Sequence, residues 1–373
     1  MFIQFLVFLL ILSILVLVHE LGHFIVARRE GIWVEEFGFG IPPRVYGKKI
    51  GETIYSINLL PIGGFVRLHG ENSEVNLSKP KRAFLNKSKK ARIKVIVAGV
   101  FMNLALAIFI FSAIYSIKGI PKEIPTNEVK VVQVAAGSPA EGAGIIIGDL
   151  VTSVEGRKVV NTDEFSEEIN KSLGETVEIT VVRNSDNLTL SLVPRENPPE
   201  GEGAIGVAIQ SSDVISYFPP IWQRPFLGIY YGFQEALFWG GAIIFGLASM
   251  FIKLLSGVVP TDVAGPVGLF AITSETSKQG FLALANLTAV ISVNLAILNI
   301  VPFPALDGGR LLFLFLEKLF GRKILPKVES AIHAVGFAVL IILILLISFR
   351  EVNIIRKAGL EGYLDQIMPQ EAR

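Results

Sequence analysis

The sequence contains no cysteine and few charged residues. Cysteine is absent from all 373 positions, which excludes disulfides, iron–sulfur clusters, thiolate zinc sites and a cysteine nucleophile. Charged residues make up 18% of the chain, whereas soluble globular proteins average about 25%. The net charge is +1 and the sequence carries no nucleic-acid recognition motif, so we expect no nucleic-acid partner. Histidines, of which there are four, and carboxylates remain as metal ligands.

Hydrophobic residues make up 51% of the chain and gather in long runs. Four runs are long enough for a bilayer, which needs about 20 helical residues. The first lacks a basic segment before it and a cleavage site after it, so it is predicted to be a retained transmembrane helix. A fifth run, 226–253, contains Glu235 and many aromatic residues, which indicates an interfacial or tightly packed helix instead. The four predicted spans are 2–26, 95–117, 284–304 and 331–349.

Basic residues orient these spans. Residues 79–94 contain many lysines and arginines and no acidic residue, and residues 305–330 are also rich in basic side chains. Both segments are therefore predicted to be cytoplasmic, and 79–94 could also contact anionic membrane lipids. Residues 119–200 carry twice as many acidic as basic side chains and are predicted to lie outside. The result is four crossings with both termini outside.

A soluble, β-rich module is predicted between residues 128 and 196. Alternating strand-like runs at 129–132, 150–154 and 177–182 flank a helix near 162–173. The glycine-rich stretch 137–144 and the turns that follow it resemble the PDZ family. PDZ domains bind extended peptides at a sheet edge, although a purely structural spacer is the alternative. The expected fold class is a polytopic α-helical membrane protein with one inserted PDZ domain and a membrane-associated β-hairpin.

The first span contains the motif His19-Glu20-Leu21-Gly22-His23. Two histidines four residues apart lie on one helix face, so both imidazoles can reach one metal ion. Glu20 lies close enough to take a proton from a water that the metal activates. Ionisable groups inside a spanning helix are costly and are seldom kept without a task. The motif therefore predicts a hydrolytic metal site inside the membrane.

Zinc needs a third protein ligand, and Asp307 is the favoured candidate. Pro302 and Pro304 break the third span, which frees backbone groups that must line a cavity. The break holds Asp307 at the cytoplasmic side, at the depth of the histidine pair. His69 and His333 are not excluded by residue type.

These features together resemble the site-2 protease family, in the bacterial branch typified by the regulator of sigma-E protease. The resemblance rests on the HExxH motif, the later NxxPxPxLDG motif and the PDZ segment between them. It implies a bacterial inner-membrane protease with His19, His23 and Asp307 as Zn²⁺ ligands and Glu20 as general base. It also implies single-span membrane proteins as substrates, regulated proteolysis such as release of anti-sigma factors or clearance of signal peptides, and a substrate contact for Asn299.

Substrate helices must be unwound before cleavage, because their carbonyls are bonded internally. An exposed strand edge could hold the unwound segment. We predict such an edge from 53–58 and 64–68, joined as a hairpin, with Gly64 and Phe65 beside the substrate. Asn103 in the second span either faces the site or serves packing with the nearby Gly99.

The predicted domain boundaries follow from these assignments. An N-terminal membrane part holds HExxH and the hairpin, and a C-terminal membrane part holds the LDG motif; a PDZ domain and a linker of interfacial helices separate them. The four parts are 1–118, 119–210, 211–283 and 284–373.

Three other functions remain open from the residues alone. A proton-coupled transporter would also bury ionisable groups, but it should show internal repeats, which are not seen. A scaffold that presents its PDZ domain would not need Glu20. A membrane-anchored peptidase with a solvent-facing HExxH should carry the motif after a span. The glycine pattern at 201–206 matches a dinucleotide fingerprint only by letter, because no helix is predicted after it.

Overall fold

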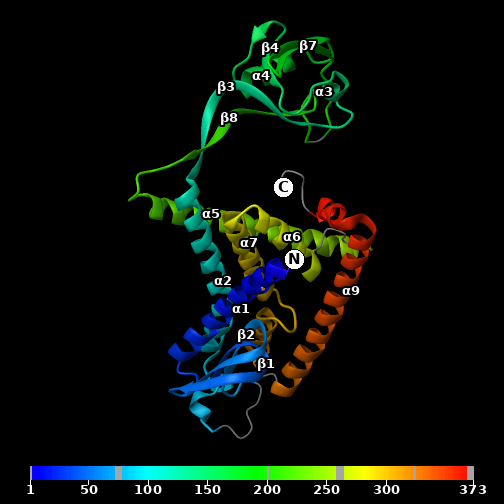
Figure 1. Cartoon of the computed structure of the whole chain (residues 1–373). Helices are drawn as coiled ribbons and strands as arrows, with labels where there is room; N and C mark the ends of the chain where they lie inside the picture. The colour runs from blue at the N-terminus through cyan, green and yellow to red at the C-terminus, as the bar shows by residue number, and fades with distance from the viewer. Residues whose placement is uncertain (1, 72–77, 200, 258–263, 322–324, 368–373) are drawn as a thin grey trace. The chain divides into compact units, whose positions relative to one another are not determined.

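The computed structural model describes residues 2–71, 78–199, 201–257, 264–321 and 325–367. The chain divides into two compact units, which we call the membrane unit and the inserted unit. The inserted unit is Gly119–Pro219, and the membrane unit comprises the residues on both sides of it, Met1–Lys118 and Pro220–Arg373. Figure 1 shows the elements of each unit along the chain.

The membrane unit is mainly helical, with a small sheet between its first two helices (Figure 1). Five helices in the described residues are long and apolar enough to cross a membrane: α1, α2, α5, α7 and α9. Three of them contain the predicted spans 2–26, 95–117 and 331–349, whereas α7 ends four residues before the predicted end of 284–304. The fifth, α5, contains the run that we interpreted as a packed or interfacial helix. The helices are α1 (Phe2–Arg29), α2 (Lys89–Lys118), α5 (Arg224–Leu255), α6 (Pro266–Lys278), α7 (Phe281–Ile300), α8 (Asp307–Phe320) and α9 (Pro326–Ile367).

Helix α5 packs against α2 through small residues. A Cβ added at Gly228 or Gly232 would lie 2.5 Å from the hydroxyl of Ser116 or Ser112, respectively, so only glycine allows this approach. Glu235 on α5 accepts hydrogen bonds from Tyr115 of α2 (2.8 Å) and from Trp239 (3.0 Å). These donors satisfy a carboxylate that would otherwise be costly in an apolar helix.

Strands β1 (Val34–Ile50) and β2 (Thr53–Leu68) form an antiparallel sheet. The prediction that 53–58 and 64–68 pair with each other is wrong. Residues 36–39 pair with both 54–57 and 64–67, and they therefore lie between the two predicted partners. The first part of β1 was not predicted as a strand, because its glycines and polar residues hide the alternation of apolar and polar side chains. One consequence is that 64–68 lies at an edge of the sheet.

The inserted unit folds around a six-stranded sheet with strand order β7-β6-β4-β3-β8, with β5 paired to β4. Its core is apolar and includes Val129, Val154, Phe165 and Ile179. The predicted strands and helix are confirmed, with β8 added at the end of the sheet, so this unit extends to Pro219 beyond the predicted 210. The elements are β3 (Ile120–Val134), α3 (Pro139–Gly142), β4 (Leu150–Val154), β5 (Arg157–Lys158), α4 (Thr162–Lys171), β6 (Val177–Arg183), β7 (Asp186–Leu192) and β8 (Val207–Tyr217).

Two local features of the inserted unit follow directly from its sequence. Asn161 caps α4 by accepting from the Glu164 backbone N–H (2.8 Å), while the Glu164 carboxylate accepts from the Val160 N–H (3.0 Å), which fixes where this helix begins. The glycine pattern at 201–206 leads into strand β8 and not into a helix, as predicted. It therefore lacks the helix N-terminus that a dinucleotide phosphate requires.

Candidate active site

Helix α1 presents both histidines of its motif to α2. His19 and His23 are each 7% exposed, and their Nε2 atoms lie 3.1 Å apart. The Nδ1 atom of His23 bonds to the backbone carbonyl of Val95 at 2.7 Å. A carbonyl can only accept, so Nδ1 carries the proton and Nε2 is left with its lone pair. This tautomer suits a metal ligand that binds through Nε2.

Asp307 joins the histidine pair from the other end of the chain. Helix α7 ends at Ile300, the two prolines prevent its continuation, and α8 begins at Asp307 after Ala305 turns with φ of 85°. The Oδ2 atom of Asp307 lies 2.9 Å from Nε2 of His19 and 3.2 Å from Nε2 of His23. The broken helix therefore brings a carboxylate to two imidazoles located almost 300 residues away in the sequence.

The three side chains fit a zinc ion in both chemistry and spacing. Their ligand atoms all lie within 4.8 Å of one another, and two imidazoles with one carboxylate form a donor set that zinc prefers. Ligands about 2.0–2.1 Å from a tetrahedral zinc lie roughly 3.3 Å apart, close to the spacing seen here. Gly99 of α2 leaves room for the pair, because a Cβ there would lie 2.6 Å from Nε2 of both histidines.

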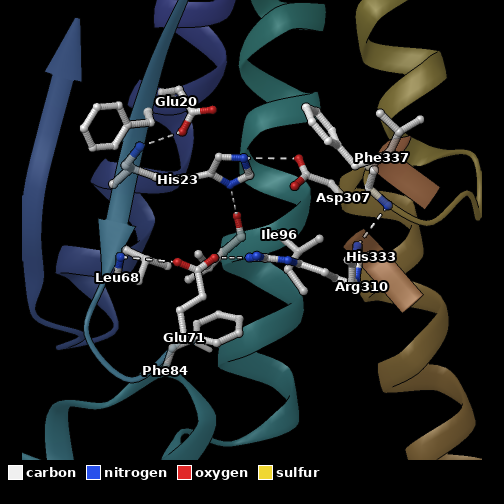
Figure 2. Close-up of a pocket in the computed structure, with 15 residues that line it drawn as sticks. Glu20, His23, Leu68, Glu71, Phe84, Ile96, Asp307, Arg310, His333 and Phe337 are labelled. Atoms are coloured by element: carbon white, nitrogen blue, oxygen red, sulfur yellow. Dashed lines mark hydrogen bonds and ion pairs between the residues drawn. The ribbon is translucent and has the colours of Figure 1, made fainter. Parts of the chain in front are cut away.

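Glu20 lies beside the triad and contacts the sheet. Its Oε2 atom accepts a hydrogen bond from the backbone N–H of Val66 at 3.0 Å. Figure 2 shows Glu20 and His23 on α1, with Asp307 facing His23 across the pocket. Because Val66 belongs to the edge segment 64–68, this carboxylate lies between the metal-ligand cluster and a strand edge.

A cavity of about 360 Å³ opens at this site, lined by side chains from α1, β2, α2, the α7–α8 break and α9. Glu20, His23 and Asp307 line it, together with an ion pair between Arg310 of α8 and Glu71 (Figure 2). Neither residue of this ion pair was among the predicted site residues. Arg310 follows Asp307 by one turn, so helical spacing could have placed it in the site, whereas nothing in the sequence distinguished Glu71.

The other two histidines have different partners. His69 binds Glu35 through Nδ1 (2.6 Å) and accepts from the Lys79 backbone N–H through Nε2 (3.3 Å), which occupies both ring nitrogens. His333 lines the cavity, and its Nδ1 accepts from the Ala305 N–H at 2.9 Å, supporting the bend before Asp307. Neither histidine belongs to the metal-ligand cluster of the described residues.

Only some of the residues predicted to contact substrate line the cavity. Phe65 lines the cavity, and Gly64 packs close to α1. Asn299 lies in the last turn of α7, outside the cavity lining. Asn103 is fully buried, its backbone carbonyl accepts from Ser292 of α7, and it does not line the cavity. Its contact with substrate therefore stays a prediction.

Comparison with known proteins identifies the family of this chain. Residues 7–343 match peptidase family M50, which covers most of the sequence and both motifs. A Clostridium perfringens protein named as a candidate zinc metalloprotease is 36% identical, with 92% of this chain and 97% of that protein covered. The regulator of sigma-W protease RasP of Bacillus subtilis is 27% identical, with 93% and 97% covered.

Solved structures similar to this chain cover only a part of it. The PDZ domain of an SdrC-like protein from Listeria innocua is 30% identical, covers 22% of this chain and 93% of that domain, and has a TM-score of 0.20.

Proposed function

The chain belongs to peptidase family M50, the site-2 proteases, and from that membership we propose that it cleaves single-span membrane proteins within or beside the bilayer. It is a zinc metalloprotease, which sets aside the transporter and scaffold alternatives. The observation that carries the proposal is that Asp307, at the start of α8, meets His19 and His23 of the apolar helix α1. A hydrolytic site on such a helix favours substrates that enter from the membrane over soluble ones.

In this proposal His19, His23 and Asp307 hold the zinc ion, and Glu20 is the general base. Zinc bound there supplies Lewis-acid chemistry for hydrolysis of a peptide bond. The Val66 N–H fixes one oxygen of Glu20, and the carboxylate takes a proton from the attacking water and passes it to the leaving amine. The buried position of the cluster excludes bulk water and strengthens the electrostatic interactions inside.

The substrate would lie along the edge segment 64–68. A peptide bond is accessible only in an unwound segment, and backbone pairing with a strand edge holds such a segment extended. This edge lies against α1 at Gly64, where a Cβ would make ordinary contacts with Leu17 (3.5 Å) and with Cγ of Glu20 (3.9 Å). Phe65 in the cavity wall would contact a substrate side chain, and Asn299 would help hold the chain at the helix break.

We assign α1, α2, α7 and α9 to four crossings of a bacterial inner membrane. The basic segment 79–94 before α2 is cytoplasmic in this assignment and contacts anionic lipid headgroups, and the inserted unit lies on the periplasmic or extracellular side. A fifth crossing by α5 would place the basic segment 305–330 outside, against the charge rule. Exposed apolar residues at the sheet tip, Ile41, Val45 and Leu59, support its association with the membrane.

The biological role that we propose is regulated proteolysis. The Bacillus subtilis relative is named as a regulator of sigma-W protease, which supports anti-sigma factors as substrates of this chain, with signal peptides as a second group. The inserted unit would bind an extended peptide as a PDZ domain. Strand β8 ends its sheet, and a peptide could pair with the outer edge of such a strand.

Cleavage of a single-span substrate by the purified protein in detergent tests this proposal. The wild-type protein should cut the substrate inside or at the edge of its span, as mapped by mass spectrometry of the products. The Glu20→Gln variant should keep its zinc and lose at least 10²-fold in rate, because the proton acceptor is removed. Equal cleavage by both proteins would contradict the assigned base and indicate a contaminating peptidase.

A further inference from the structure

Several buried polar groups near the site lack hydrogen-bond partners in the described residues, and Nε2 of His333 is one of them. Two others lie on α1 and α2: the Nδ1 atom of His19 and the side-chain amide of Asn103, whose oxygen and nitrogen are both without a hydrogen bond. Asn103 is 0% exposed and His19 is 7% exposed. An unpaired polar group is costly inside an apolar helix bundle, where no bulk water compensates for the missing bond. Each of these groups therefore requires a partner.

The helix packing places Asn103 one helical turn from the point where α2 faces His19. Gly99 faces the imidazole of His19, because a Cβ there would lie 2.5 Å from Cε1, the carbon next to Nδ1. Asn103 follows Gly99 by four residues and so lies on the same face of α2, one turn further along. Helical side chains lean toward the N-terminus of their helix, which directs the amide of Asn103 back over Gly99.

A comparison of the two histidines shows that His19 lacks a hydrogen-bond acceptor for its Nδ1 atom. His23 has its outer partner, since Nδ1 donates to the Val95 carbonyl while Nε2 faces Asp307. His19 also presents Nε2 to Asp307. If Nε2 binds zinc as proposed, Nδ1 would carry the N–H, and this atom has no acceptor in the described residues. Metal-binding histidines almost always donate this second N–H, and the acceptor fixes the tautomer and orientation of the ring.

We propose that Asn103 is a positioning residue whose side-chain oxygen accepts from Nδ1 of His19, directly or through one buried water. Ser292 of α7 supports this placement, because its hydroxyl donates to the Asn103 backbone carbonyl at 2.7 Å and holds the residue at the contact of the two helices. Asn103 would thus orient a zinc ligand without touching zinc or substrate. The inference rests on the proposed function, since it concerns a ligand of that site.

Zinc affinity of the full-length protein, measured by competition with a chelator, tests this role. Asn103→Leu keeps the approximate size and removes the acceptor, and it should weaken zinc binding roughly 10- to 100-fold. Asn103→Asp keeps an acceptor oxygen and should stay within a few-fold of the wild type. A pure packing role predicts the opposite order, because leucine is tolerated in an apolar contact and a carboxylate is not.

Any ranking in which Asn103→Leu binds zinc as well as Asn103→Asp, or better, overturns the proposal. If either variant fails to fold, Asn103→Ser and Asn103→Ala replace the pair, with tighter zinc binding again expected for the variant that carries an acceptor. Ser112→Ala is the control on the same helix, because it removes a buried hydroxyl that donates to the Ile108 carbonyl, and it should keep wild-type affinity. The proposed function is tested separately by zinc binding and cleavage in the wild-type protein, whatever these variants do.

Discussion

The two units of the protein bury polar side chains in opposite ways. The inserted unit has an apolar core, and its most buried acid, Asp149, accepts hydrogen bonds from Arg183 and from the Ile146 backbone. The membrane unit buries histidines, two asparagines and several charges, and it holds all but one of the unpaired buried polar atoms in the described residues. Buried polar groups therefore stabilise the fold of the inserted unit, whereas those in the membrane unit include the side chains of the candidate active site.

This difference has a physical reason. A small β-rich module gains its stability by burying apolar surface, and any polar group inside must be paired to avoid a penalty. A helix bundle in lipid gains less from burial of apolar groups, so a polar group in it is kept where a function requires it. The comparison predicts that substitutions in the membrane unit's site change zinc binding and cleavage, whereas those in the inserted unit change local stability.

The largest effect is expected from loss of the carboxylate ligand. Asp307→Ala leaves two imidazoles to hold zinc, so metal content should fall to near zero and cleavage should become undetectable. Metal analysis and the cleavage assay measure both. Asp186→Ala, at an exposed turn of the inserted unit, is the control and should keep both. Normal zinc content in Asp307→Ala would remove this residue from the ligand set.

Gly99→Ala is expected to have the next largest effect. The added methyl group would lie 2.6 Å from both histidine Nε2 atoms and must displace the rings or α2 itself. Zinc affinity should fall by at least roughly tenfold, comparable to losing an outer-shell partner. Gly241→Ala on α5 adds the same methyl group in open space and should bind zinc normally. Equal affinity in the two variants would show that the site tolerates a shift at this contact.

Arg310→Gln should lower stability without removing zinc. The change removes the ion-pair partner of the Glu71 carboxylate in the cavity, and among the described residues the Leu68 backbone N–H, at 3.4 Å, remains as a donor. An unpaired, partly buried charge of this kind costs about 1–3 kcal/mol of unfolding free energy, measurable by denaturant titration in detergent. The double variant with Glu71→Gln should recover part of the loss. A double variant less stable than Arg310→Gln would exclude this explanation.

The smallest effect is expected in the inserted unit. The ion pair with Arg183 lowers the pKa of Asp149, so the folded state favours the ionised carboxyl. Its stabilisation is fully present above the unfolded pKa of about 3.9 and is lost as the pH falls through the lower folded pKa. Asp149→Asn should therefore weaken amide exchange protection in residues 128–192 by about 1–2 kcal/mol at neutral pH.

This difference in protection between Asp149→Asn and the wild type should shrink as the pH is lowered below about 4. Cleavage of the model substrate at neutral pH should be unchanged, since no atom of the site lies in this unit. A difference that stays constant with pH would show that the ion pair does not cause it.

The sequence was sufficient to predict the long helices and to single out His19, His23 and Asp307, which the structure brings together. Apolar runs of bilayer length are strong signals, and HExxH defines one helix face without reference to the rest of the fold. The proline pair at 302 and 304 marked the break that places Asp307. Each of these features can be recognised from residues that are close together in the sequence or from a physical requirement of the membrane.

The remaining features depend on contacts between segments far apart in the sequence. The first part of β1 was overlooked because Glu36, Gly38 and Gly40 occupy its buried positions, which hides the alternation of apolar and polar residues. Glu71 and Arg310 are distant in sequence, and their pairing follows from tertiary packing alone. The burial of Asn103 was likewise invisible, because one sequence does not specify which helix covers α2 at that turn.

The central claim is that two histidines and one aspartate, drawn from α1 and the start of α8, form the zinc site. X-ray absorption spectroscopy at the zinc edge of the purified protein counts imidazole ligands directly. The account predicts two imidazoles with the remaining ligands oxygen. Three imidazoles would contradict it, because His69 or His333 would then take the place assigned to Asp307.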